Sequence, residues 1–214
     1  MNYKELAKEN YKRFSYIDGN THIASEYALS TILKLLEDFK VKSILEVGLG
    51  IGSISDTILK YTKIKNQKIE YTGTESNDFC LNALKTNVEN YNLIELYASI
   101  SDIANNQKYD FIIVDGSDES LKKIASFCKT NTIIFVEGFR SSQVDSIKSI
   151  FPNFKHVEII SLYKNPKHGP FPTEKWAGGG QLIFINPSFI DKTYWFKEKL
   201  KSFLKRRLRK FKKS

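Results

Sequence analysis

The sequence predicts an α/β fold with a doubly wound, mostly parallel sheet. The first indication is a short apolar run at residues 43–47 that leads directly into three glycines at alternate positions, Gly48, Gly50 and Gly52. A buried strand followed by a turn without side chains lets a ligand lie against the backbone. The second indication is a run of four apolar residues at 111–114, which is typical of a parallel strand buried on both faces.

The spacing of the glycines favours one kind of ligand. A dinucleotide site takes glycines at the first, third and sixth positions of the turn, whereas here they occupy the first, third and fifth, with Ser53 sixth. Glu46 lies two residues before the first glycine, where a carboxylate disfavours a pyrophosphate and favours an ammonium or sulfonium group. A helix is predicted to begin near Ile51, so that its free N–H groups point into the same crevice. The alternative is a turn that holds no ligand.

Residues 46–52, Glu-Val-Gly-Leu-Gly-Ile-Gly, resemble motif I (Glu/Asp-x-Gly-x-Gly-x-Gly) of the class I S-adenosylmethionine-dependent methyltransferases. The resemblance implies a Rossmann-like fold with a seven-stranded sheet whose last strand is antiparallel. It implies S-adenosyl-L-methionine as the cofactor, with Glu46 and the glycines of the turn holding its methionine part. Within the family, the chain looks nearest to the catechol-type and macrocin-type O-methyltransferases.

The next predicted strand, residues 69–74, ends at a second acid, Glu75, which lies 23 residues after Gly52. A βαβ unit brings the end of its second strand alongside the first turn. A carboxylate there can accept both hydroxyls of a ribose. The arrangement looks like motif II of the same family, whose acid holds the ribose of the cofactor.

A helix over residues 77–90 and a strand over 93–97 are predicted next. The family contacts the adenine ring with residues just after this strand. The resemblance therefore assigns Ser99 and Asp102 to the cofactor site. The alternative for Asp102 is that it only caps the following turn.

Two further predicted strands end in acids at the edge of the sheet where ligands bind. Asp115 follows the buried strand, and Glu137 follows a strand predicted over 133–136. Residues 114–118, Val-Asp-Gly-Ser-Asp, resemble motif IV and the Asp-Gly-Asp-His segment of the macrocin-type enzymes, which also assigns Asp115 to the cofactor. In the metal-dependent members, acids at these places bind a divalent cation. The resemblance thus implies Mg²⁺ or another divalent cation on Asp115 and Glu137, but Gly138 replaces the family's third ligand, for which Asp118 is the candidate substitute.

The alternative role for Asp115 and Glu137 is that of a general base or of a group that orients the substrate. His22 is a further catalytic candidate, because it lies with Glu26 at the start of the helix predicted before the glycine turn. In the catechol-type and macrocin-type enzymes, a helix of this kind borders the active site. A capping histidine is the alternative.

A helix over 141–150 and a strand over 156–162 precede a long connection at 164–180 and a last strand at 181–185. A connection of this length without secondary structure is usually functional. Three of its side chains are candidates for a lid over the substrate, with ordinary anchoring of the loop as the alternative. They are His168, Lys175 and Trp176.

The positive charge is concentrated near the C-terminal end. Residues 192–213 hold eleven basic residues and one acid, a charge of +10, whereas the whole 214-residue chain carries +9. The remainder is therefore nearly neutral, which excludes a domain that coats nucleic acid with a generally basic surface. Phenylalanines and leucines recur every three or four residues among these cations, which predicts a basic amphipathic helix lying on an anionic membrane surface. RNA binding is the competing interpretation, and a solvated, frayed tail is the other alternative.

The two cysteines, Cys80 and Cys128, indicate neither a disulfide framework nor a zinc site, which favours a reducing cytoplasm. No apolar run approaches the ~18 to 20 residues of a membrane span, and the N-terminus does not resemble a signal peptide. We expect a cytoplasmic protein, held peripherally at the inner face of the membrane by its basic tail.

The sequence predicts an N-terminal helical extension (1–20), a methyltransferase domain (21–187) and a basic amphipathic helix (188–214). The expected activity is O-methylation of a small molecule or glycan, such as a lipid-linked sugar. The chain lacks the Asn/Asp-Pro-Pro-Tyr segment that enzymes methylating amino groups of nucleic-acid bases commonly use. The alternatives are an RNA methyltransferase, a non-catalytic cofactor-binding module and an NAD-dependent oxidoreductase.

Overall fold

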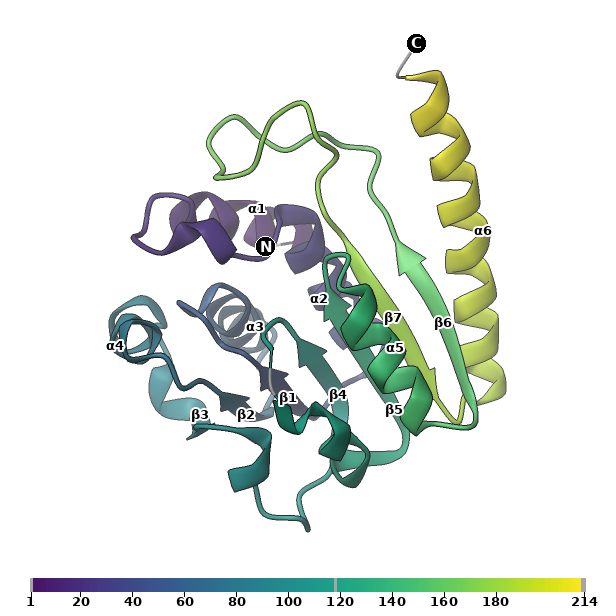
Figure 1. Cartoon of the computed structure of the whole chain (residues 1–214). Helices are drawn as coiled ribbons and strands as arrows, with labels where there is room; N and C mark the ends of the chain where they lie inside the picture. Colours follow the sequence, from purple (N-terminus) through teal and green to yellow (C-terminus); the bar gives the residue numbers. More distant parts are fainter. Residues whose placement is uncertain (1, 118, 213–214) are drawn as a thin grey trace.

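The computed structural model describes residues 2–117 and 119–212 and contains one seven-stranded sheet (Figure 1). Its strand order is β3-β2-β1-β4-β5-β7-β6, and β7 is antiparallel to both of its neighbours. The predicted fold class, including the antiparallel last strand, is confirmed. The strands are β1 (Ser43–Val47), β2 (Glu70–Thr74), β3 (Ile94–Tyr97), β4 (Tyr109–Val114), β5 (Cys128–Glu137), β6 (Phe154–Ile159) and β7 (Gly180–Ile185).

The described residues also form six α-helices and four 3₁₀ helices. The helix predicted to begin near Ile51 begins two residues later, because Gly52 has a left-handed φ of 94° and stands before the first helical turn. The α-helices are α1 (Tyr3–Phe14), α2 (Glu26–Phe39), α3 (Ser53–Ile64), α4 (Asp78–Asn87), α5 (Ser141–Ile150) and α6 (Phe189–Phe211). The 3₁₀ helices are η1 (Asn20–His22), η2 (Tyr91–Leu93), η3 (Ile100–Asp102) and η4 (Glu119–Phe127).

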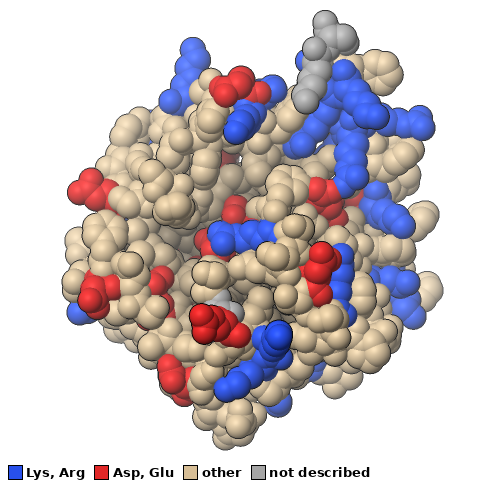
Figure 2. Space-filling view, viewed as in Figure 1, with Lys and Arg blue, Asp and Glu red and all other residues tan. Residues whose placement is uncertain are grey.

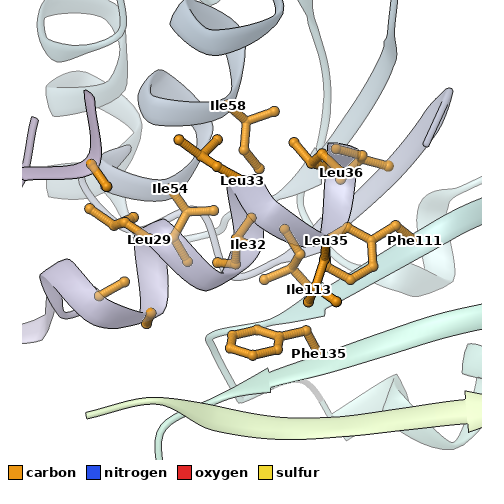
Figure 3. Packing of buried hydrophobic residues seen from close by; sticks show 14 of the residues in the cluster. Leu29, Ile32, Leu33, Leu35, Leu36, Ile54, Ile58, Phe111, Ile113 and Phe135 are labelled. Atoms are coloured by element: carbon orange, nitrogen blue, oxygen red, sulfur yellow. The ribbon is translucent and has the colours of Figure 1, made fainter. Parts of the chain in front are cut away.

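The sheet is covered on both faces, because alternate side chains of its central strands point to opposite sides. On one face, Phe111, Ile113 and Phe135 of β4 and β5 meet the leucines and isoleucines of α2 and α3 (Figure 3). On the other face, Ile112 and Val114 pack with residues of η4 and α5. This sandwich fixes the carboxyl ends of β1, β4 and β5 side by side.

Helix α1 packs on α2 and α3 as part of the first core. Tyr11 and Phe14 are completely buried. Asp56 of α3 is also buried and forms ion pairs with Arg13 of α1 and, at 2.9 Å, with Lys60. The first helix is therefore attached by both apolar and charged contacts.

Residues 160–179 form a long irregular segment before β7, and α6 then runs along β6 (Figure 1). Three glycines lead into β7. A Cβ atom on Gly179 would lie 1.9 Å from the carbonyl oxygen of Ile159, and one on Gly180 would lie 2.3 Å from the ring of Phe135. A Cβ atom on Gly178 would make only ordinary contacts with Ser25. No helix within the described residues is long and apolar enough to cross a membrane.

Candidate active site

The carboxyl end of β1 opens into the glycine turn. Gly48, Gly50 and Gly52 all have positive φ values, 85°, 54° and 94°. A Cβ atom on Gly48 would lie 2.5 Å from the backbone of Gly116, which follows β4, whereas one on Gly50 would meet nothing within 4 Å. The first glycine therefore lets two strand ends approach, and the second leaves backbone open to a ligand.

Glu75 lies beside this turn, at the end of β2. Its Oε2 accepts the N–H of Gly50 at 2.8 Å, and its Oε1 accepts the N–H groups of Ser76 and Asn77 at 2.9 and 2.8 Å. These three bonds hold the carboxylate in place. Since a carboxylate has about four acceptor sites, it retains capacity for a hydroxyl donor.

Glu46, in β1, is completely buried. Its Oε2 accepts a hydrogen bond from the hydroxyl of Tyr71, and its Oε1 has no partner among the described residues. Burial raises the pKa of Glu46 to about 8; the bond from Tyr71 opposes the rise, and the charge of Glu75 adds to it. A buried acceptor without a donor is costly, so a cationic ligand group that reached it would be stabilised.

A cavity of about 290 Å³ lies over the glycine turn. It brings three predicted site residues together, His22, Gly50 and Asp115, and it does not include Glu46. A larger hollow, of about 620 Å³, lies at the amino ends of β1 and β2, away from every predicted site residue. The cavity over the turn is lined by Gly19, His22, Ile23, Leu49, Gly50, Ile51, Ser53, Asn77, Phe79, Cys80 and Asp115.

Asp115 and Glu137 end neighbouring strands, and their carboxyl groups lie within hydrogen-bonding reach of each other. Arg140 donates to Oδ1 of Asp115 at 3.0 Å. Burial is the largest cause that raises the pKa of both acids; the charge of Glu137 raises the pKa of Asp115 further, and Arg140 opposes the rise. The backbone N–H of Ser25, which caps α2, also stabilises the charged form of Glu137. Two carboxyls this close favour a state in which they share one proton.

The acids at this edge do not fit a divalent-cation site as far as the structure describes them. No group of three histidine, cysteine or acidic side chains suited to a metal occurs in residues 2–117 and 119–212. The guanidinium of Arg140 already bonds Asp115. Asp118, the predicted third ligand, lies outside the described residues. A cation on Asp115 and Glu137 thus stays a prediction that the described donors do not support.

Ser99 and Asp102 form the capping box of η3. The Oγ of Ser99 accepts the N–H of Ser101 at 3.2 Å, and Asp102 accepts the N–H of Ser99 at 3.0 Å. Neither side chain lines the cavity over the turn. The capping interpretation of Asp102 is confirmed, and contact of either residue with an adenine stays a prediction.

The three lid candidates lie outside the cavity and anchor their segment. His168 packs on Tyr11 of α1 with ring centroids 5.8 Å apart. Trp176 lies between Lys164 and Arg209, whose charged groups are 4.1 and 4.9 Å from its ring centroid. The carbonyl of Lys175 accepts the N–H of Asn165 at 3.1 Å. These contacts correspond to the anchoring alternative.

No protein-family model and no curated protein sequence matches the chain, but solved structures match its fold. An O-methyltransferase from Bacillus cereus in complex with SAH has a TM-score of 0.59 and 13% identity, over 85% of this chain and 90% of that one. A putative caffeoyl-CoA O-methyltransferase from Staphylococcus aureus has a TM-score of 0.54 and 16% identity, over 86% and 92%. A putative RNA methyltransferase from Pyrococcus horikoshii has a TM-score of 0.50 and 13% identity, over 84% and 96%.

The chain has the class I methyltransferase fold. This agrees with the family resemblance of residues 46–52. Two of these structures are named O-methyltransferases and one is named an RNA methyltransferase, so the methyltransferase fold leaves the acceptor of this chain open.

Within the methyltransferase fold, sequence reasoning missed two residues beside the predicted ones. Arg140 reaches Asp115 from three residues beyond the end of β5. Tyr71 of β2 donates to Glu46 across the sheet. The sequence signal for Arg140 was a basic residue three positions after a strand that ends in an acid. Tyr71 could have been located only from the parallel pairing of β1 with β2, in which it lies opposite Ile44.

Proposed function

We propose that this protein is an S-adenosylmethionine-dependent methyltransferase that modifies an oxygen of a small molecule or glycan, lipid-linked sugars included. One observation carries the proposal. The N–H of Gly50 bonds the carboxylate of Glu75 at 2.8 Å, beside backbone that faces open space. A carboxylate at the end of β2 next to an open glycine turn suits an adenosyl ligand with a free ribose. The methyltransferase fold supports the same assignment.

The residues around the turn fit this cofactor. Gly50 leaves room for it, and Glu75 retains acceptor capacity for a ribose hydroxyl. The unpartnered Oε1 of Glu46 suits the ammonium of the methionine part. When bound, the cofactor supplies a methyl group on a positively charged sulfur.

The chain's own share of the chemistry is to position the acceptor and to remove its proton. Burial raises the pKa of both Asp115 and Glu137, so the pair holds one shared proton and one carboxyl of the pair is ionised. The ionised carboxyl then takes the proton that the acceptor hydroxyl loses as its oxygen gains the methyl group. Arg140 holds Asp115 in position, and His22 lines the cavity through which the acceptor approaches.

The test is isothermal titration with S-adenosylhomocysteine. We expect micromolar binding by the wild type and at least about tenfold weaker binding by Glu75→Gln, which loses an acceptor oxygen but keeps the shape of the side chain. Glu70→Gln is the matched control, because Glu70 begins the same strand at the opposite edge of the sheet and is exposed. Its affinity should equal that of the wild type.

Two results would contradict the proposal. One is tighter binding of NAD than of S-adenosylhomocysteine, which would indicate an oxidoreductase. The other is cofactor binding without methyl transfer from labelled cofactor to any component of a cell extract, which would indicate a non-catalytic module. Methyl transfer that is lost in both Asp115→Asn and Glu137→Gln would support the assigned proton transfer.

A further inference from the structure

Helix α6 attaches to the edge strand β6 by one face. The indole N–H of Trp195 donates to the carbonyl of His156 at 2.7 Å, and the hydroxyl of Ser202 donates to the carbonyl of Glu158 at 2.6 Å. Arg209 donates to the carbonyl of Ser161 at 2.8 Å. The three donors are spaced seven residues apart, about two helical turns, so they mark one side of the helix.

The side of α6 turned away from the sheet is apolar. Phe196, Leu200 and Phe203 are 61%, 50% and 51% exposed although they are large hydrophobic side chains. Their spacing of three and four residues places them on one face. We call this face the outer stripe; it consists of Phe196, Leu200, Phe203, Leu204, Leu208 and Phe211, all about half exposed or more.

Cations border the outer stripe on both sides. Lys192, Lys199 and Arg206 recur every seven residues along one border, and Lys197 and Lys201 lie four apart on the other. The helix holds nine basic residues and two acids, and both acids, Asp191 and Glu198, are buried. Figure 2 shows the basic side chains gathered over α6.

Most of these cations are available to an external anion. Within the described residues, Lys192, Lys197, Lys199, Arg207 and Lys210 make no ion pair. Lys201 pairs with Glu198, and Arg206 with Glu158. An apolar stripe is therefore presented to the surroundings between two rows of cations, and Lys192, Lys197 and Lys199 of these rows make no ion pair within the described residues.

We propose that α6 is a membrane-docking helix that inserts the outer stripe into the interface of an anionic bilayer. Apolar side chains between rows of lysine and arginine match acyl chains below anionic headgroups. A second copy of this chain fits poorly, because two outer stripes in contact would bring like charges together. RNA would use the cations but would leave the leucines of the stripe without a partner.

Docking would also orient the methyltransferase site. The contacts of α6 advance along β6 in chain order, from His156 to Ser161, so the helix runs in the same direction as the strand. The C-terminal half of α6 therefore lies toward the sheet edge that carries Asp115 and Glu137. If the proposed function holds, docking through α6 therefore sets the direction in which this sheet edge faces relative to the bilayer.

The test is sedimentation of the full chain with vesicles of phosphatidylcholine, with and without about one third phosphatidylglycerol. The stripe variant carries Phe196→Gln, Leu200→Gln and Phe203→Gln. The control carries Tyr16→Gln, Ile64→Gln and Leu93→Gln, which are also exposed hydrophobic residues but lie elsewhere. We expect wild type and control to bind anionic vesicles, and the stripe variant to bind about tenfold more weakly or not at all.

Circular dichroism verifies that each variant is folded, and neither cofactor nor acceptor is present, so this result is independent of the test of methyl transfer. Binding of the stripe variant equal to that of the wild type would overturn the proposal. So would tighter binding of single-stranded RNA than of anionic vesicles. A dimer in analytical ultracentrifugation that the stripe variant abolishes would overturn it in favour of self-association.

Discussion

Glu46, a buried carboxyl in the strand before the glycine turn, makes the stability of the folded chain depend on pH. In the folded chain its pKa is raised to about 8 from an ordinary value of 4.5, mainly by burial. Between these values the folded state holds a proton that the unfolded state has lost. The free energy of unfolding therefore does not depend on Glu46 below its ordinary pKa of 4.5, and it falls as the pH rises from there toward 8. Each pH unit crossed corresponds to about 1.4 kcal/mol.

Glu46→Gln should remove this dependence. We expect the free energy of unfolding of the wild type to fall more between pH 5 and pH 8 than that of the variant, because the amide does not ionise and still accepts from Tyr71. Urea unfolding at the two pH values measures the difference. Parallel pH profiles of the two proteins would show that the carboxyl is already ionised in the folded chain.

Among single residues, those predicted correctly from the sequence are the ones whose position follows from the topology of the sheet. Parallel strands end at a common edge, so Glu75, Asp115 and Glu137 had to lie near the glycine turn. Arg140 could not be located this way, because a long side chain after a strand has many rotamers and only the fold shows which one reaches Asp115. The unpartnered oxygen of Glu46 likewise depends on packing.

At the scale of the element, the turn after β1 contains two glycines with different roles. A Cβ atom on Gly48 would collide with backbone of Gly116, whereas one on Gly50 would enter open space. We expect Gly48→Ala to destabilise the fold by several kcal/mol and Gly50→Ala by about 1–2 kcal/mol, the cost of a left-handed residue with a side chain. Chemical denaturation measures both values.

The variants Gly48→Ala and Gly50→Ala also distinguish an effect on stability from an effect on cofactor binding. Gly50→Ala places a methyl group where the ligand is proposed to lie, so it should weaken S-adenosylhomocysteine binding while the protein stays folded. If both variants lost the same stability, the closer packing around Gly48 than around Gly50 would be contradicted. Unchanged cofactor affinity in Gly50→Ala would place the ligand elsewhere.

Elements with strong local signals were predicted with nearly correct bounds, and those set by tertiary contacts were not. Helix α5 occupies its predicted residues. Strand β6 ends at Ile159, before the predicted end at 162, because the carbonyls of Ile160 and Ser161 turn to accept from α6. No helix was predicted over η4, where Leu121, Ile124 and Phe127 bury one side at the three-residue spacing of a 3₁₀ helix.

At the scale of the whole molecule, α6 holds the segment 160–179 in place. The guanidinium of Arg209 bonds the carbonyl of Ser161 and lies 4.9 Å from the ring centroid of Trp176. Arg209→Ala should therefore increase hydrogen exchange across this segment several-fold, since both contacts are lost together. Arg207→Ala is the control, because Arg207 lies over Phe203 on the outer side of the same helix. Equal exchange in both variants would show that the contacts of Arg209 do not hold the segment.

The three glycines at 178–180, where β7 begins, differ in the space around them, and the difference bears on how this chain can evolve. Position 179 lies against the carbonyl of Ile159 and position 180 against the ring of Phe135, so neither admits even one extra carbon without moving the sheet. Position 178 has room. Among descendants of this sequence, alanine or serine should accumulate at 178 while 179 and 180 stay unchanged. Of the three consecutive glycines, two are therefore required by close contacts and one is free to change.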